Sequence, residues 1–223
     1  MTETTGGLAA FDFDGTVSRR DTLVPFLALA AGRRRFLDGW RQVGLRAVRG
    51  RVDPRDRDAV KAELIDLLLA GRAETELEEL GERYARDLLS EDQLRPLVLH
   101  RIRSHRARGD TCVLVSASLV YYLRPIAREL GMAGVVGVDP EVRDGLLTGS
   151  MRRPNVRAEQ KVVQLHDWME RSGIVPAEGR RSAYGNTSGD HALLRAADHR
   201  YWLGRPGSVP EGAEVLTAAT PLR

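Results

Sequence analysis

Hydrophobic positions along the chain follow two patterns. Five short apolar runs are rich in β-branched or aromatic residues, which is typical of buried strands. Longer segments between them repeat apolar residues every three or four positions, as amphipathic helices do. The strands are expected at residues 8–13, 111–116, 134–138, 181–185 and 200–204, the helices at 119–131, 158–172 and 189–197, and a hairpin turn at Asp144 and Gly145. This alternation predicts an α/β fold with a Rossmann-like parallel sheet covered by helices on both faces.

One long segment interrupts the alternation. Residues 21–105 contain no convincing strand and carry several helical patterns. The sequence Ser-Glu-Asp-Gln at 90–93 has the spacing of a capping box and is expected to open a further helix. We therefore predict two domains, a core made of residues 1–20 and 106–223 and an all-helical cap of residues 21–105 inserted after the first strand. The C-terminal segment is expected to be mostly loop with one edge strand.

The first strand ends in two acidic residues, Asp12 and Asp14. Alternation along a strand would place both carboxylates on one side. Because close carboxylates repel each other, the pair needs a cation between them or one bound proton. Magnesium that shares its coordination with a phosphate meets this need. A calcium loop does not fit, since Gly15 comes two positions early and Leu23 stands where a bidentate Glu is required.

Three further segments carry candidate chemistry near other strand ends. Ser116 and Ser118 precede an expected helix, where a hydroxyl and free N–H groups can hold an anion. Lys161 falls in the first turns of the next helix and is one of only two lysines. Asn186 and Asp190 follow the fourth strand. Each segment also has a simpler interpretation. The serines can act as a helix cap, Lys161 can be a solvated surface residue, and Asn186 and Asp190 can form an Asx turn with a helix cap.

In this order, the motifs resemble those of the haloacid dehalogenase superfamily of phosphatases. The matching stretches are "DFDGT" at 12–16, "VSAS" at 115–118, Lys161 and "GNTSGD" at 185–190. The resemblance extends from Leu8 to about Gly204, nearly the whole chain. The helical insert resembles the cap of the phosphoserine-phosphatase-like branch, known as subfamily IB with a C1 cap.

This resemblance implies roles for particular residues. Asp12 would be the nucleophile that forms an aspartyl phosphate, and Asp14 the general acid and then the general base. Lys161 would neutralise the nucleophile and the transferring group. The resemblance assigns phosphate or substrate binding to Thr16, Asp21, Ser116, Ala117 and Ser118. Asp21 could equally cap the helix that follows it.

The same resemblance implies a magnesium site formed by Asp12, Asp14, Asn186 and Asp190. The fourth motif departs from the family pattern, because its first acid is replaced by Asn186. An amide oxygen can coordinate a cation but carries no charge. We therefore predict a magnesium site that is weaker than usual, with Asp190 available as a ligand directly or through water.

The amino-acid composition excludes several classes of protein. The 223 residues are 42% hydrophobic and 29% charged, as in ordinary soluble globular proteins. Net charge is only +3 and the arginines alternate with acids, so no stripe for nucleic acid is expected. The single cysteine, Cys112, excludes an internal disulfide. The sequence shows no secretory signal and no apolar run approaching the roughly 20 residues of a membrane span, which predicts a cytoplasmic protein.

The leading prediction is a magnesium-dependent phosphomonoesterase acting on a small phosphorylated metabolite. Within this class, a phosphoserine phosphatase or a phospholipid-head-group phosphatase is an alternative. A non-catalytic phosphate-binding module is an alternative of a different class, suggested by Asn186. The basic and aromatic stretch 32–36 with Trp40 allows weak docking on a membrane surface, against the simpler interpretation of a solvated loop with a buried Trp40. Oligomeric state stays open.

Overall fold

A six-stranded sheet with only parallel neighbours forms the centre of the computed structural model, which describes residues 6–90 and 92–222. The strand order is β3-β2-β1-β6-β7-β8. The strands are β1 (Leu8–Phe11), β2 (Thr111–Leu119), β3 (Gly134–Val138), β6 (Arg181–Gly185), β7 (His199–Trp202) and β8 (Glu214–Val215). The α/β class, the five predicted strands and the C-terminal edge strand are thereby confirmed.

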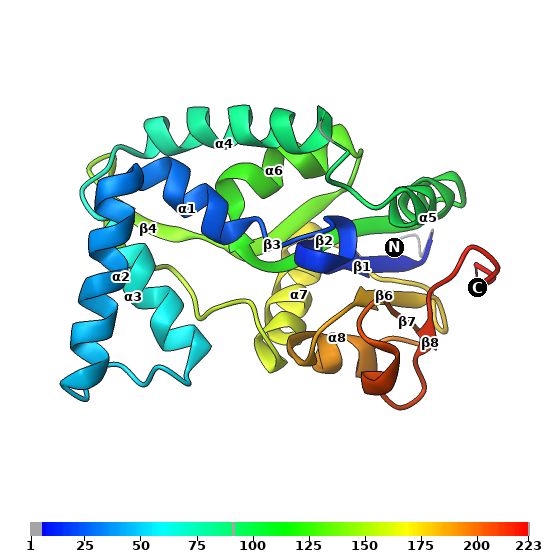
Figure 1. Cartoon of the computed structure of the whole chain (residues 1–223). Helices are drawn as coiled ribbons and strands as arrows, with labels where there is room; N and C mark the ends of the chain where they lie inside the picture. The colour runs from blue at the N-terminus through cyan, green and yellow to red at the C-terminus, as the bar shows by residue number, and fades with distance from the viewer. Residues whose placement is uncertain (1–5, 91, 223) are drawn as a thin grey trace.

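Helices cover both faces of the sheet (Figure 1). One face carries α5 (Pro96–Ala107) and α6 (Val120–Glu129), and the other carries α7 (Glu159–Ser172) and α8 (His191–Arg195). Because both faces are covered, every residue of β1 is buried. The ring of Tyr184 stacks on Phe11 at 4.4 Å and on Tyr201 at 4.7 Å, which ties the central strands together.

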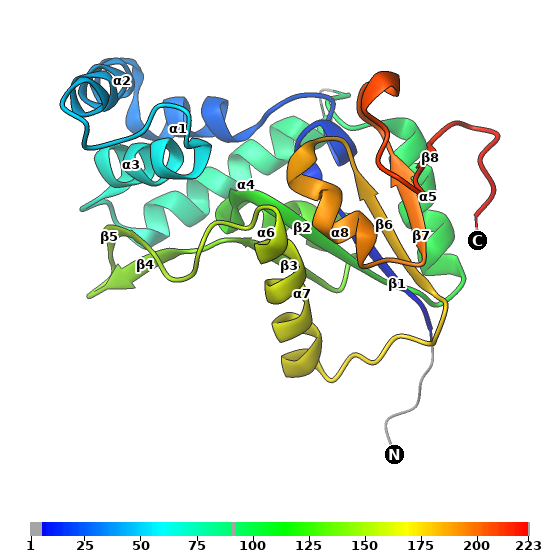
Figure 2. The same cartoon turned by 90° about the horizontal axis from the view of Figure 1, so that it is seen from below.

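The segment after β1 is helical, as predicted. It contains α1 (Leu23–Ala31), α2 (Arg33–Val48), α3 (Arg57–Leu69) and α4 (Glu74–Ser90). Helices α1, α2 and α3 pack on one another at one end of the molecule (Figure 2), and α4 packs on α6. Gly81 allows this close packing, since a Cβ there would lie 2.3 Å from the Tyr121 carbonyl oxygen. Among the described residues, no helix is both long and apolar enough to cross a membrane.

The next helix begins later than the capping-box sequence predicted. Helix α5 begins at Pro96, with Arg95 as its N-cap, and Ser90 is instead the last residue of α4. Glu91 lies outside the described residues. Proline suits the first turn because the missing N–H has no helical partner there. Helix α5 contacts β2 and the turn after β1, so it lies against the sheet.

A two-stranded hairpin links the sheet to the inserted helices. It consists of β4 (Pro140–Arg143) and β5 (Leu146–Met151). Asp144 and Gly145 have φ angles of 51° and 77°, the left-handed conformation that tight hairpin turns require, and this confirms the predicted turn. Strand β5 packs against α3. The hairpin therefore supports the helix that faces the strand ends.

A buried histidine of α5 connects the residue before β2 to strand β6. His105 Nδ1 lies 2.8 Å from Asp110 Oδ2, and the Tyr184 hydroxyl lies 2.9 Å from His105 Nε2. Burial lowers the pKa of His105, although Asp110 opposes this shift. Burial also opposes the charged form of Asp110, but hydrogen bonds from His105 and Arg108 lower its pKa. The network is therefore built for a neutral histidine beside an ionised aspartate.

Acid should weaken the fold through His105. Its pKa is lowered in the folded protein, so the unfolded chain binds the proton first as pH falls below about 6.5. The free energy of unfolding should decrease from pH 7 to pH 5 in urea titrations, and His105→Gln should flatten that decrease. His100→Gln, at an exposed position of the same helix, should keep the wild-type slope. An unchanged slope in His105→Gln would contradict this role.

Candidate active site

A wide helical turn follows β1 and orients the two acids of the first motif. The strand ends at Phe11, and residues Phe13–Val17 form the turn, with Gly15 at a φ of 76°. A Cβ at Gly15 would lie 2.2 Å from the side chain of Asn186, so only glycine fits. The predicted strand over 8–13 was therefore too long. The turn, and not strand alternation, directs Asp12 and Asp14 toward different partners.

Lys161 joins Asp12 to Asp190. Its Nζ donates to Asp12 Oδ1 at 2.7 Å and to Asp190 Oδ1 at 2.6 Å. The lysine is only 2% exposed. Burial opposes the ammonium charge, but the two carboxylates outweigh it and raise the pKa of Lys161. The structure thus brings together three predicted site residues from the end of β1, from α7 and from the loop after β6.

The second oxygen of Asp12 faces Thr16. The Thr16 hydroxyl donates to Asp12 Oδ2 at 2.9 Å. Burial, and then the charge of Asp190, raise the pKa of Asp12 to about 7 although Lys161 opposes them. One lysine therefore does not fully compensate the carboxylates gathered here, and the site favours additional positive charge.

Asp14 is held by a separate set of donors. The Thr22 N–H and hydroxyl donate to Asp14 Oδ1 at 2.8 and 2.5 Å. The Ser118 hydroxyl donates to Asp14 Oδ2. Burial raises the pKa of Asp14, and the hydrogen bonds from Ser118 and Thr22 oppose that shift. A raised pKa favours the protonated form of Asp14, which suits a group that donates a proton.

The second motif lies inside a strand that is longer than expected. Strand β2 continues to Leu119, the N-cap residue of α6, so neither serine begins the helix. Ser116 is 1% exposed, and its Oγ accepts a hydrogen bond from the Ser118 N–H at 3.2 Å. The helix N-terminus that we predicted as the anion cradle therefore lies beyond these serines. Phosphate binding by Ser116, Ala117 and Ser118 stays a prediction.

Asp190 shapes the fourth motif. Its Oδ2 accepts hydrogen bonds from the Asn186 N–H at 3.0 Å, the Thr187 N–H at 2.9 Å and the Thr187 hydroxyl at 3.1 Å. Burial opposes ionisation, but Lys161 outweighs it and lowers the pKa of Asp190. Both carboxylate oxygens thus have partners within the protein. These bonds favour a positioning role, and ligation of a metal by Asp190 stays a prediction.

The Asn186 side chain lies among three oxygens. With its nitrogen inward, Nδ2 lies 3.2 Å from each of Asp12 Oδ2, the Asp14 carbonyl oxygen and Thr16 Oγ1. With its oxygen inward, the Asn186 amide oxygen faces Asp12 Oδ2 and the Asp14 carbonyl oxygen, and no hydrogen-bond donor lies between them. A hard cation bound there would compensate these oxygens. Among the described residues, no group of three or more His, Cys, Asp or Glu side chains could hold a metal ion. The oxygen set nevertheless fits magnesium through one carboxylate, one carbonyl and one amide.

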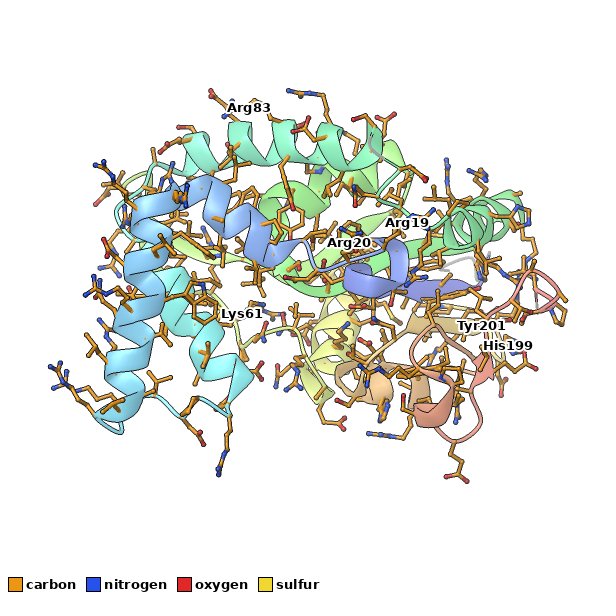
Figure 3. The ribbon with its side chains drawn as sticks, in the orientation of Figure 1. Arg19, Arg20, Lys61, Arg83, His199 and Tyr201 are labelled. Carbon is orange, nitrogen blue, oxygen red and sulfur yellow. The ribbon has the colours of Figure 1, made fainter. Side chains whose placement is uncertain are left out.

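Lys61 reaches this site from α3, and the sequence did not identify it as a site residue. Its Nζ donates to the Ala117 carbonyl and to Asn155 Oδ1, the latter at 2.7 Å. Asn155 Nδ2 in turn donates to Asp58 Oδ1 at 2.7 Å. Figure 3 shows Lys61 projecting from α3 toward the α/β core. Burial lowers the pKa of Lys61 to about 7, against the charges of Asp14 and Asp58.

Two other residues flank the turn after β1. Asp21 is exposed, and its carboxylate lies 3.4 Å from the N–H groups of Leu23 and Val24 at the start of α1. This geometry supports the capping interpretation, and substrate contact by Asp21 stays a prediction. Arg95 Nε donates to the Gly15 carbonyl at 3.2 Å and so braces the turn. No sequence pattern pointed to this arginine.

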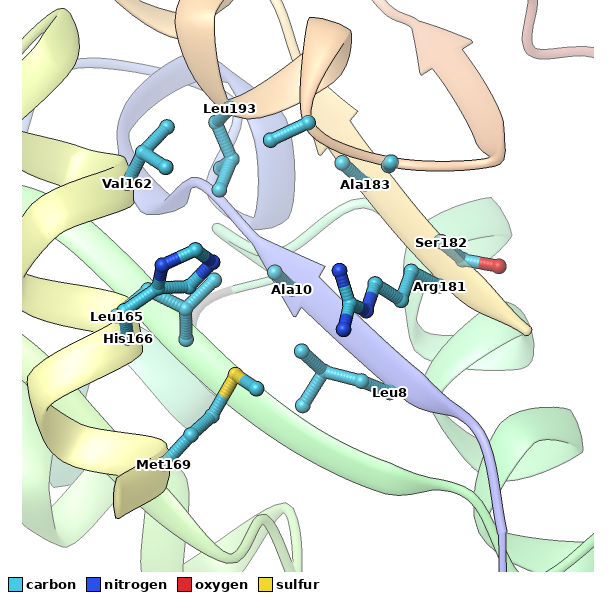
Figure 4. Close-up of a pocket in the computed structure, with 12 residues that line it drawn as sticks. Leu8, Ala10, Val162, Leu165, His166, Met169, Arg181, Ser182, Ala183 and Leu193 are labelled. Carbon is cyan, nitrogen blue, oxygen red and sulfur yellow. The ribbon is translucent and has the colours of Figure 1, made fainter. Parts of the chain in front are cut away.

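The pocket in Figure 4 is separate from these residues. It lies between α7 and the sheet, and its lining includes Leu8, Leu165 and Met169. None of the predicted site residues lines it. Its apolar walls identify a gap in the packing of α7 on the sheet.

Comparisons with known proteins agree with this geometry. A family model described as haloacid dehalogenase-like hydrolase matches residues 9–195. Protein CicA of Caulobacter vibrioides is 33% identical over 206 residues, which cover 89% of this chain and 88% of that protein. Phosphoserine phosphatase SerB2 of Mycobacterium tuberculosis is 29% identical over 85% of this chain and 42% of its own length.

A solved structure shares the whole architecture. It is a protein of unknown function from Bordetella pertussis Tohama I, 28% identical, with a TM-score of 0.73 over 92% of this chain and 93% of that one. Together with the match to a phosphoserine phosphatase, this agrees with the branch of the superfamily predicted from the motifs.

Replacing Asn186 should strengthen metal binding. Asn186→Asp adds a negative charge and removes the nitrogen that competes for the same oxygens. The affinity for Mg²⁺ or Mn²⁺, measured by calorimetry, should rise by roughly tenfold or more. Gln42→Glu adds the same charge at an exposed position of α2 and should leave the affinity unchanged. Equal affinities in Asn186→Asp and the wild type would contradict this assignment.

Proposed function

The chain belongs to the haloacid dehalogenase-like hydrolases, and on that basis we propose that it hydrolyses the phosphate monoester of a small metabolite through an aspartyl phosphate on Asp12. The observation that carries the proposal is the environment of Asp12. One carboxylate oxygen faces the buried ammonium of Lys161, and the other faces the Thr16 hydroxyl. These groups are donors that a transferring phosphoryl group requires.

In the first step, an Asp12 carboxylate oxygen attacks phosphorus and the bond between phosphorus and the ester oxygen breaks. Asp14 gives its proton to the departing oxygen, which leaves with the bonding electron pair as an alcohol. The raised pKa of Asp14 supports this role, because the acid must be protonated when substrate binds. Ser118 and Thr22 hold the carboxyl group in place during the transfer.

In the second step, water attacks the phosphorus of the aspartyl phosphate. Asp14, now ionised, takes the proton of that water, and the bond between phosphorus and Asp12 breaks. Inorganic phosphate leaves and both carboxyl groups return to their starting states. Lys161 stays between Asp12 and Asp190 throughout, so the site keeps its shape as charge moves.

Asp12, the Asp14 carbonyl and the Asn186 amide oxygen would hold magnesium. When bound, this ion offsets the negative charge of the phosphoryl oxygens. The sequence predicted a cap of residues 21–105, but α5, which begins at Pro96, lies against the sheet. We further propose that the inserted helices before α5 act as the cap and that Lys61, carried by α3, binds an anionic group of the substrate. Its position beside Ala117 and the influence of the Asp14 charge on its pKa support this role.

Removing the nucleophile should abolish turnover. Asp12→Asn keeps the side-chain shape but loses the nucleophilic oxygen, so hydrolysis of p-nitrophenyl phosphate should fall below about one-thousandth of the wild-type rate. Asp38→Asn makes the same change at an exposed position and should retain full activity. Retained activity in Asp12→Asn would contradict the assignment. Binding of phosphorylated metabolites without hydrolysis by the wild type would instead favour the non-catalytic alternative.

Removing the charge of Lys61 should weaken substrate binding more than turnover. In Lys61→Met, KM for p-nitrophenyl phosphate should rise by roughly ten- to a hundredfold, as expected for a lost charged hydrogen bond, with a smaller change in kcat. Lys61→Arg preserves the charge and should restore part of the loss. A wild-type KM in Lys61→Met would show that this lysine only supports the fold.

A further inference from the structure

Helix α2 exposes an apolar stripe on its outer side. Leu37, Trp40 and Val48 are 54%, 40% and 88% exposed. Gly44 lies between them, so the spacing of three and four residues places all four on one side of the helix. Leu45, 53% exposed, lies beside the stripe. Of the ten large hydrophobic side chains exposed in the described part of the chain, six belong to α1 and α2.

This exposure is not a consequence of a poorly packed helix. The opposite side of α2 buries Gly39 and Val43. A Cβ at Gly39 would lie 2.7 Å from the side chain of Leu68, so α2 and α3 are in close contact. The stretch predicted as a solvated loop with a buried tryptophan is instead the start of a helix with an exposed Trp40. Its outer side faces away from the rest of the molecule (Figures 1 and 2).

Positive charge accompanies the stripe. Helix α2 contains five arginines and one aspartate, a formal charge of +4, whereas the whole chain carries +3. Arg33 and Arg34 are exposed and form no ion pair with any described residue. Arg41 pairs with Asp38 at 3.5 Å, and both side chains stay open to solvent. Arg46 pairs with Glu63, and Arg35 donates to carbonyls at the end of α3. The positive charge of the exposed side therefore comes from Arg33, Arg34 and Arg41.

We propose that this face of α2, made of Arg33, Arg34, Leu37, Trp40, Arg41 and Val48, docks on an anionic lipid surface. The helix would lie in the plane of the surface, with Trp40 and the aliphatic side chains entering the head-group boundary and the arginines contacting lipid phosphates. Its 16 residues, about 24 Å in length, suit contact along the surface. The proposal rests on α2 alone and does not depend on the proposed hydrolysis.

The charge and the surroundings of this face of α2 favour a lipid surface over other partners. A second copy of the chain would bring the same arginines against each other, which disfavours self-association through this face. Five pockets in the described part of the chain lie elsewhere, and none of these five, which a peptide could enter, contains a residue of this face. A lipid surface supplies both the negative charge and the apolar layer that this face lacks.

Sedimentation with lipid vesicles tests the charge requirement. The protein should bind vesicles of phosphatidylcholine with about one-third phosphatidylglycerol, bind phosphatidylcholine alone poorly, and lose binding as salt rises. The double variant R33E/R34E should lower the partition coefficient at least about 25-fold, since each arginine near an anionic membrane contributes roughly a factor of five. R83E/R86E changes net charge equally on exposed residues of α4, where Arg83 points outward (Figure 3), and should bind like the wild type.

Tryptophan fluorescence tests the apolar contact. Anionic vesicles should shift the emission to shorter wavelength, and brominated lipid should quench it. Trp40→Phe should lose this response, whereas Trp168→Phe should keep it. Circular dichroism verifies that each variant is folded.

Three results with vesicles would overturn the proposal. They are no binding to anionic vesicles, an equal loss of binding in both arginine double variants, and a response that survives in Trp40→Phe. A dimer in light scattering that Leu37→Ser dissociates would also overturn it, because a second copy would then cover this face.

Discussion

The buried ammonium of Lys161 is the interaction on which the site depends. It bonds to Asp12 and Asp190, and so links the turn after β1, helix α7 and the loop after β6. A buried charge is costly unless it is paired and hydrogen bonded, so loss of either carboxylate would leave the lysine uncompensated. Asp190 in turn holds the backbone of Asn186 and Thr187. Lys161 therefore couples the first, third and fourth motifs, and the second motif joins them through the hydrogen bond from Ser118 to Asp14.

The same arrangement leaves the site short of positive charge. Asp12 and Asp190 share the single charge of Lys161, and the pKa of Asp12 rises to about 7 as a result of burial and the neighbouring carboxylate. An incoming phosphate would add further negative charge, so a cation has a clear physical purpose here. The amide of Asn186 can answer this demand in two ways. Its nitrogen supplies a partial positive charge itself, and its oxygen helps to hold a metal. Metal binding therefore competes with the hydrogen bonds that the nitrogen makes when it points inward.

Local sequence patterns were sufficient for the strands, the Asp144-Gly145 hairpin and the motif order, because strand propensity and turn chemistry act over a few residues. These patterns failed where contacts between distant parts of the chain determine the local structure. The first strand ends two residues early, because the turn that follows needs Gly15 against Asn186. Helix α5 begins at Pro96 and not at the capping-box sequence. The contact of Lys61 with Ala117 spans 56 residues, and no spacing rule could reveal it.

That contact also explains how the cap could respond to substrate. The present partners of Lys61 are neutral oxygens, those of Ala117 and Asn155. A phosphate or carboxylate would bind the ammonium more strongly than these acceptors, since charge-assisted hydrogen bonds are about twice as strong as neutral ones. Burial has lowered the pKa of Lys61 to about 7, so an anionic ligand would also favour its charged form. Substrate charge would thus stabilise the contact between α3 and β2, and so link substrate recognition to the position of the inserted helices.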